Sequence, residues 1–174
     1  FDMSEYSHHE ANIEFCGSDK VYKHGNKGNF TSFIEDNPQC VVLFDEIEKA
    51  HSVITNLFLQ MLDAGIIRDN YTDKELSLEN VWMIFTTNAG KQLYENSELS
   101  DFSALSRKVI IKALKDDINP LTNQPFFPAA ICSRFASGNV AMFNHITPHN
   151  LIDIAKKEIA NSASVFERES GIAI

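Results

Sequence analysis

The sequence predicts an α/β fold built on a mostly parallel β-sheet. Two continuous apolar runs, 39–44 and 81–86, lack any polar and apolar alternation and are typical of strands buried on both faces. An amphipathic helical pattern lies between them, and this strand, helix, strand order is that of a parallel sheet covered by helices. A hydrophobic content of 44% and a charged content of 22% are those of a folded globular chain.

The helix between the two strands is predicted to begin at Ser52, an N-cap residue, and to end at Gly65. Its apolar positions follow helical spacing: Val53, Ile54, Leu57, Phe58, Met61 and Leu62. Residues 65–80 carry several turn signals and predict a small exposed excursion, such as a hairpin.

Beyond the second strand, Val109, Ile110, Ala113 and Leu114 form one face of a predicted helix. Prolines then break the helical pattern over 120–128. A short strand is predicted over 140–143. Thr147 and Pro148 form an N-cap and first-turn pair that opens a last helix, reaching about residue 166.

Composition and charge exclude several classes of protein. No apolar run reaches the roughly 18 residues of a membrane span. The sequence also does not start with a basic segment followed by an apolar one, as a leader would, so we expect a soluble chain without a membrane partner. The net charge of −9 argues against nucleic acid as a partner. Three cysteines far apart in the sequence, with no pair at zinc spacing, indicate a reducing, cytoplasmic compartment.

Polar residues follow both predicted strands, at the edge of a parallel sheet where ligands bind. Asp45 and Glu46 end the first strand, and Asn88 follows the second. This pattern suits phosphoryl transfer: one acid can hold Mg²⁺, the other can orient and polarise an attacking water, and the amide can contact that water or a phosphate. Arg134, in a stretch that we interpret as irregular, can neutralise charge in the transition state across a subunit boundary.

Each of these residues also has a purely structural interpretation. An acidic pair after a strand can cap the helix that follows and complement its dipole. Asn88, before Ala89 and Gly90, can be a turn residue. Arg134 can be a surface or ion-paired arginine.

Five segments resemble the Clp family of AAA+ ATPases, which are protein unfoldases and disaggregases. Residues 41–51 (VVLFDEIEKAH) resemble its Walker B segment over eleven consecutive positions, which makes the match specific. Residues 2–6 resemble the strand end before the pore-loop region, 59–65 the following helix, 86–90 the sensor 1 segment, and 143–151 a later strand and helix entry. The resemblance implies a P-loop NTPase-like AAA+ large domain that uses ATP and Mg²⁺.

The resemblance also implies a role for each candidate residue. Asp45 would coordinate Mg²⁺, Glu46 would activate the hydrolytic water, and Asn88 would sense the terminal phosphate. Arg134 would be the arginine finger, although it lies one residue later than usual after its Phe-x-Pro segment. Tyr22 would be the aromatic residue of the substrate pore loop, although the glycines that flank this position in the family are replaced here by lysines; an ordinary exposed loop is the alternative.

One family motif is missing from the sequence. No Gly-x-x-x-x-Gly-Lys-[Ser/Thr] phosphate loop occurs in the 174 residues, and the family places that loop and its strand just before Phe1. We therefore expect an incomplete domain: residues 1–170 would be a partial AAA+ large domain, from the Walker B to the arginine-finger region, and 171–174 the start of a small lid domain. We expect these residues alone not to hydrolyse ATP.

The predicted function is that of a Clp-type chaperone or unfoldase which, in a longer parent, forms a ring, as a hexamer, and couples ATP hydrolysis to unfolding or threading of polypeptides. Residues 91–133 contain no glycine and hence no Ile-Gly-Phe or Ile-Gly-Leu tripeptide, which argues against docking to the Clp peptidase. A non-catalytic assembly scaffold with weak or no nucleotide binding is the main alternative. A nucleic-acid remodelling protein such as a helicase loader is a third, disfavoured by the acidic charge.

Overall fold

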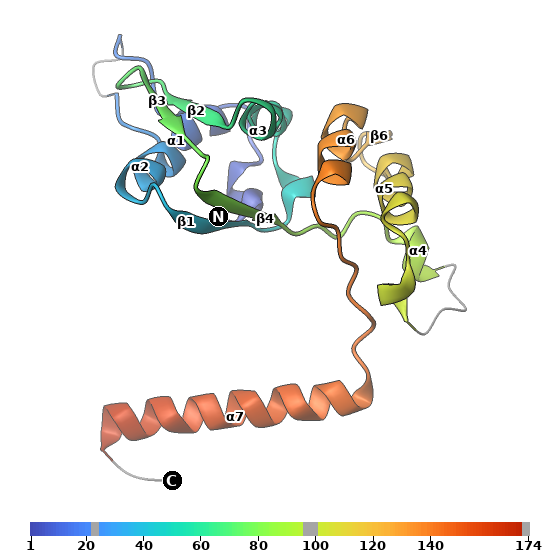
Figure 1. Cartoon of the computed structure of the whole chain (residues 1–174). Helices are drawn as coiled ribbons and strands as arrows, with labels where there is room; N and C mark the ends of the chain where they lie inside the picture. The colour runs from blue at the N-terminus through green and yellow to red at the C-terminus, as the bar shows by residue number, and fades with distance from the viewer. Residues whose placement is uncertain (22–24, 96–100, 172–174) are drawn as a thin grey trace. The chain divides into compact units, whose positions relative to one another are not determined.

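The computed structural model describes residues 1–21, 25–95 and 101–171. The chain divides into two compact units, one of residues 1–97 and 105–141 and the other of residues 98–104 and 142–174. Figure 1 draws both, with labels on the α-helices and on most of the strands. Among the described residues, no helix combines the length and apolar character that a membrane crossing requires.

The first unit is built on a parallel pair of strands, β1 (Cys40–Phe44) and β4 (Val81–Phe85), whose register aligns Phe44 with Phe85. The start of the chain extends the sheet on the other side of β1: Asp45 donates its backbone N–H to the carbonyl of Phe1, and Met3 donates to the carbonyl of Asp45. This arrangement confirms the predicted α/β class with parallel strands.

One face of this sheet carries an aromatic core. The ring centroid of Phe44 lies 5.1 Å from that of Phe85 and 4.9 Å from that of Phe58 on α3 (Ser52–Ala64). Phe15 on α1 (Ala11–Cys16) stacks on Phe30 of α2 (Asn29–Asp36) with centroids 4.6 Å apart. Phe15, Phe30, Phe44 and Phe58 are all at most 2% exposed, so three helices bury this face by aromatic contacts.

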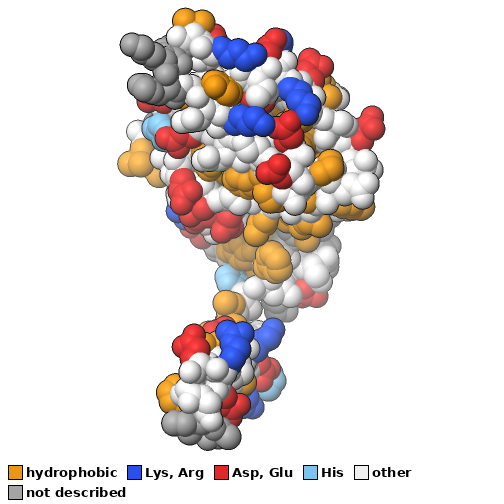
Figure 2. All heavy atoms as spheres, turned by 90° about the vertical axis from the view of Figure 1, so that its left-hand side faces the viewer, with side chains coloured by type: hydrophobic (Ala, Val, Ile, Leu, Met, Phe, Trp, Pro, Cys, Tyr) orange, Lys and Arg blue, Asp and Glu red, His pale blue; other side chains and the backbone are white. Residues whose placement is uncertain are grey.

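The opposite face is exposed, contrary to the prediction of strands buried on both sides. Val41, Leu43, Trp82 and Ile84 are 63%, 46%, 75% and 51% exposed. Alternation along a strand places these four side chains together, since Val41 aligns with Trp82 and Leu43 with Ile84. Hydrophobic side chains also gather on the surface of the larger body in Figure 2.

The predicted excursion at 65–80 is a hairpin of β2 (Ile66–Asp69) and β3 (Lys74–Ser77). Gly65 ends α3 in the left-handed conformation, with φ of 65°, and its N–H donates to the carbonyl of Met61, as the sequence predicts. The N-cap, however, is His51 rather than Ser52: the ring Nδ1 of His51 accepts the Val53 N–H at 3.3 Å.

A helical pair completes the first unit. α5 (Arg107–Asp116) packs against α6 (Ala129–Ser137), and α6 also packs against α3. The short pair β5 (Ile118–Asn119) and β6 (Gln124–Pro125) joins α5 to α6, and α4 (Gln92–Glu95) precedes them. Three short 3₁₀ helices, η1 (Met3–Tyr6), η2 (Ile47–Lys49) and η3 (Phe102–Ala104), lie elsewhere in the described chain.

The second unit contains η3 and the long helix α7 (Pro148–Ser170). Thr147 caps α7 as predicted: its hydroxyl accepts the Asn150 N–H at 3.2 Å, while the Asn150 side chain accepts the Thr147 N–H at 3.0 Å. The predicted strand at 140–143 is wrong, because these residues have no regular structure. A strand needs a ladder partner, and no strand in the described ranges pairs with this segment.

Candidate functional site

The parallel sheet brings the predicted acids and amide together. Because Phe44 and Phe85 end β1 and β4 at the same level, the residues that follow them, Asp45 and Thr86, emerge side by side. Thr86 continues the pairing by donating its N–H to the Phe44 carbonyl at 3.0 Å and accepting the Ile47 N–H at 3.0 Å. The strand ends therefore hold two polar loops in a fixed relation.

Thr86 connects the two loops through its side chain. Its hydroxyl donates to the Asp45 carboxylate and accepts the Glu46 N–H at 3.1 Å. One half-buried hydroxyl thus fixes both members of the acidic pair. Thr86 was not predicted to be a site residue; its position directly after an apolar strand, level with Asp45, is the signal that could have identified it.

Glu46 adopts the left-handed conformation, with φ of 55° and ψ of 49°. Residues with a side chain rarely adopt it, and the strain is typical of functional positions. The Glu46 carboxylate forms an ion pair with Lys49 and accepts a hydrogen bond from Asn88 Nδ2 at 3.2 Å. The turn therefore directs this carboxylate toward Asn88.

Glu48 holds the Asn88 loop from the other side. Its carboxylate accepts from Asn88 Nδ2 and from the Asn88 N–H, both at 3.2 Å, and from the Thr87 hydroxyl at 2.7 Å. Glu48 was not predicted to be a site residue. Asp45 and Asn88 remain exposed, so the cluster is open to a ligand while its backbone is held in place.

A family profile described as AAA domain (Cdc48 subfamily) matches residues 1–136, which include the whole cluster. The chain belongs to this family. The chaperone protein ClpB of Clostridium tetani is 36% identical over 121 residues, covering 68% of this chain and 14% of ClpB. The ATP-dependent Clp protease ATP-binding subunit ClpC of Staphylococcus epidermidis is 33% identical over 128 residues, covering 68% of this chain and 16% of ClpC.

Two solved structures share the fold of this AAA domain. A closed-state cryo-EM reconstruction of Hsp104 with ATPγS and FITC-casein superposes with a TM-score of 0.73 at 27% identity, over 91% of this chain and 26% of that one. The extended S. cerevisiae Hsp104–casein complex gives 0.71 at 28% identity, with the same coverage. The resemblance to Clp-type AAA+ ATPases is therefore confirmed, and the chain spans about a quarter or less of the proteins it matches.

Arg134 lies outside the cluster of this AAA domain. It belongs to α6 and not to an irregular stretch as predicted, because Pro128 is the N-cap residue of a helix here instead of preventing one. Its guanidinium forms an ion pair with Asp63 near the end of α3, in which Nη2 lies 3.0 Å from Oδ2. The hydrogen bond from Arg134 holds the pKa of Asp63 below its ordinary value.

Two other predictions concern Tyr22 and a bound metal ion. Tyr22 lies outside the described residues; the described residues on either side of it form a loop whose base is a bridge between Gly17 and Lys27. In the described ranges, no three His, Cys, Asp or Glu side chains gather closely enough to hold a metal ion by themselves. A cation at Asp45 would therefore need oxygens from elsewhere.

Proposed function

We propose that this chain is part of a Clp-type ATPase that couples ATP hydrolysis to the unfolding or threading of polypeptides within a hexameric ring. The observation that carries the proposal is the convergence of Asp45, Glu46 and Asn88 at the ends of two parallel strands, held by Thr86 and Glu48. Relatives named as a chaperone and as an ATP-dependent protease subunit, and Hsp104 bound to ATPγS and casein, support this substrate and this nucleotide.

Glu46 is the residue that orients and polarises the attacking water. Its carboxylate accepts a hydrogen bond from Asn88 Nδ2, so a water that took the place of this bond would meet an acceptor and a donor at once. Asn88 would report the terminal phosphate to the Glu46 and Glu48 loop, because its amide contacts both acids. Exchange of these bonds for bonds to phosphate would change the position of Glu46.

The residues present fit Mg²⁺ as a partly protein-bound ion. Mg²⁺ prefers hard oxygen ligands and commonly binds through one or two carboxylates plus waters and phosphate oxygens. Asp45 offers an exposed carboxylate beside the Thr86 hydroxyl, which matches that donor set. When bound, the ion would supply charge neutralisation at the phosphates.

Three further roles belong to the same proposal. Arg134 would act as the arginine finger at a neighbouring nucleotide, and would have to leave Asp63 to do so. Tyr22 would contact the polypeptide. Remodelling in the cytoplasm is the third, and the absence of glycine from residues 91–133 argues against docking to the Clp peptidase.

The 174 residues by themselves are proposed not to hydrolyse ATP, because they contain no Gly-x-x-x-x-Gly-Lys-[Ser/Thr] motif whose backbone and lysine would hold the phosphates. The competing function is a scaffold in which the acidic pair is retained without nucleotide binding. A measurement on the full protein distinguishes the ATPase from the scaffold, whereas a measurement on these 174 residues alone does not.

The deciding experiment compares Glu46→Gln with Glu75→Gln in the protein that contains this chain. Glu75 is an exposed acid on β3, away from the cluster, and serves as the matched control. We expect Glu46→Gln to slow ATP turnover by about 10²–10⁴-fold, the range for loss of a general base, while Mg-ATP binding is retained. Equal turnover in both variants would contradict the role of Glu46, and absence of Mg-ATP binding in the unmodified protein would favour the scaffold.

A further inference from the structure

The loop between Gly17 and Gly28 is closed at its base by hydrogen bonds. Gly17 and Lys27 form an antiparallel bridge, Ser18 donates its N–H to the Asn26 carbonyl at 3.0 Å, and Asn26 donates to Ser18 Oγ at 2.9 Å. At Gly28 the backbone crosses the end of α1 so closely that a Cβ would lie 2.3 Å from the Phe15 carbonyl oxygen. The described ends of this loop are therefore held together at its root, mainly by backbone contacts.

A single buried carboxylate joins this root to the β2–β3 hairpin. Asp69, at the end of β2, is only 2% exposed. Its Oδ2 accepts the Gly28 N–H at 3.2 Å and a hydrogen bond from the Thr31 hydroxyl at the start of α2. Its Oδ1 accepts the Thr72 N–H at 2.7 Å and the Thr72 hydroxyl at 2.8 Å. One oxygen thus holds the loop and α2, and the other holds the hairpin turn.

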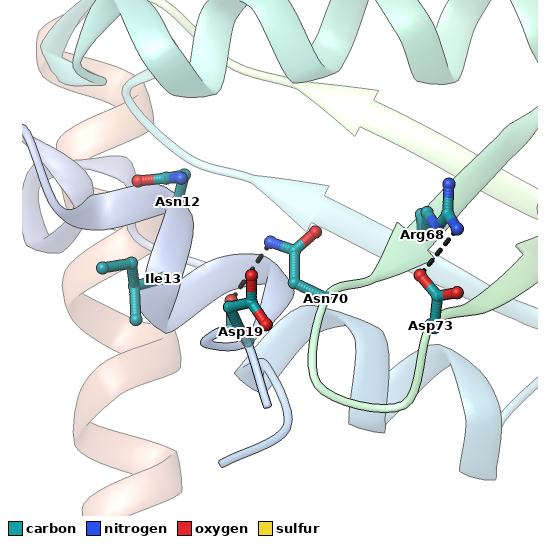
Figure 3. A pocket seen from close by; sticks show the side chains of 7 residues that line it. Asn12, Ile13, Asp19, Arg68, Asn70 and Asp73 are labelled. Carbon is teal, nitrogen blue, oxygen red and sulfur yellow. Dashed lines mark hydrogen bonds and ion pairs between the residues drawn. The ribbon is translucent and has the colours of Figure 1, made fainter. Parts of the chain in front are cut away.

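Other hydrogen bonds and ion pairs also join the loop root and α2 to the hairpin. Asn70 donates its backbone N–H to the Cys16 carbonyl at 2.8 Å and its side chain to the Gly17 carbonyl at 3.1 Å. Figure 3 shows the Asn70 side chain turned toward the segment that carries Asp19. Glu35 on α2 pairs with Lys27 at 2.6 Å and with Lys74 of the hairpin at 2.7 Å. These ion pairs lie at the surface, so the buried Asp69 is the stronger connection.

We propose that Asp69 is a positioning residue that makes the β2–β3 hairpin and the root of the 18–27 loop move as one body. A buried carboxylate that lost its partners on either side would be left unsatisfied, so separating the two elements is costly. A displacement of the hairpin is therefore passed to the loop instead of being absorbed between them. Because Asp69 is buried, it would act on a bound ligand only through the loop that it holds.

The consequence for activity rests on the proposed function. If the 18–27 loop contacts the polypeptide, Asp69 sets the affinity for polypeptide through the loop and leaves the chemistry at Glu46 unchanged. The hairpin leads through β3 into β4 and hence to Thr86 and Asn88, which gives the nucleotide site a covalent route to this body.

The test uses Asp69→Asn, with Asp73→Asn as its matched control. Asp73 lies in the same turn in a left-handed conformation that asparagine tolerates, and its exposed carboxylate pairs only with Arg68 among the described residues. Amide hydrogen exchange of the chain is measured at Ser18, Asn26 and Gly28, and at the strand amides of β1 and β4. We expect exchange about tenfold faster or more at the loop root in Asp69→Asn, and no change in Asp73→Asn.

Unchanged exchange at the loop root would overturn the proposal, and so would an equal increase throughout β1 and β4, which would mean only general destabilisation. Should Asp69→Asn fail to fold, Thr72→Val removes the hydroxyl on the hairpin side alone and should give the same local pattern. In the full protein, Asp69→Asn should raise the KM for an unfolded casein severalfold, while the kcat for ATP turnover should stay unchanged. Faster local exchange with an unchanged KM would retain the coupling and reject the role of the loop in polypeptide binding.

Discussion

Replacing Thr86 with valine tests whether the Thr86 hydroxyl positions Asp45 and Glu46 in the candidate site. Valine has the shape of threonine without the hydroxyl, so Thr86→Val removes the acceptor of the Glu46 N–H and the donor to Asp45 while preserving the packing of the strand end. Thr86→Ser is the matched control because it keeps the hydroxyl and loses only a methyl group. The perturbation therefore isolates two hydrogen bonds.

The expected magnitude follows from the exposure of the two partners. A neutral N–H to hydroxyl bond at a half-buried backbone contributes about 1 kcal/mol. The bond to Asp45 contributes less, about 0.5 kcal/mol, because that exposed carboxylate can accept from water instead. Glu46 would then be free to leave its left-handed conformation, which itself costs about 1 kcal/mol or more. If the lost 1.5 kcal/mol is felt only in the transition state, ATP turnover falls about tenfold.

The assay is steady-state ATP turnover of the full protein, with Mg-ATP binding measured in parallel by calorimetry. We expect Thr86→Val to lower kcat about tenfold with little change in binding, and Thr86→Ser to stay within about twofold of the unmodified protein. A Thr86→Val protein that turns over ATP at the normal rate would refute the positioning argument. A Thr86→Ser protein as slow as Thr86→Val would assign the effect to packing.

Three other predictions concern the core, the buried acid and the arginine pair. Phe44→Ala should lower the free energy of unfolding by about 3–5 kcal/mol in urea titrations, because Phe44 is fully buried, whereas Val41→Ala on the exposed face should cost less than about 1 kcal/mol; equal costs would contradict the described faces of the sheet. Burial acts to raise the pKa of Asp69, but hydrogen bonds from Thr31, Thr72 and Gly28 outweigh it and hold this pKa below 3.8. The stability that Asp69 contributes is therefore complete above about pH 4 and lost as the pH falls through the lowered pKa, so the urea midpoint of the unmodified chain should approach that of Asp69→Asn below that range; parallel pH profiles would contradict this. Arg134→Ala should raise the pKa of Asp63 toward its ordinary 3.8 in an NMR titration, and an unchanged pKa would show that the ion pair does not form in solution.

The sequence predicted the elements whose signals are local. β1, β4 and α3 follow from apolar runs and helical spacing, and Gly65 and Thr147 end or begin helices as expected because caps depend on neighbouring residues only. The convergence of Asp45, Glu46 and Asn88 was also predictable, since the carboxyl ends of parallel strands meet at one edge.

The remaining features depend on contacts between distant residues. The 140–143 segment has a strand-like composition, but a strand forms only against a partner. Arg134 was misplaced because Pro128, which we interpreted as a helix breaker, stands where a helix begins. Thr86 and Glu48 were not predicted because they act through hydrogen bonds to residues of the other loop.

The exposed face of the sheet can be followed by the intrinsic fluorescence of the protein. Trp82 is the single tryptophan of the chain and is 75% exposed on that face, beside Val41. Indole emission shifts to shorter wavelengths when water leaves the ring, and a soluble quencher such as acrylamide then reaches it less easily. Intrinsic fluorescence can therefore follow, without any label, whether a given preparation of the protein has this apolar surface bare or covered.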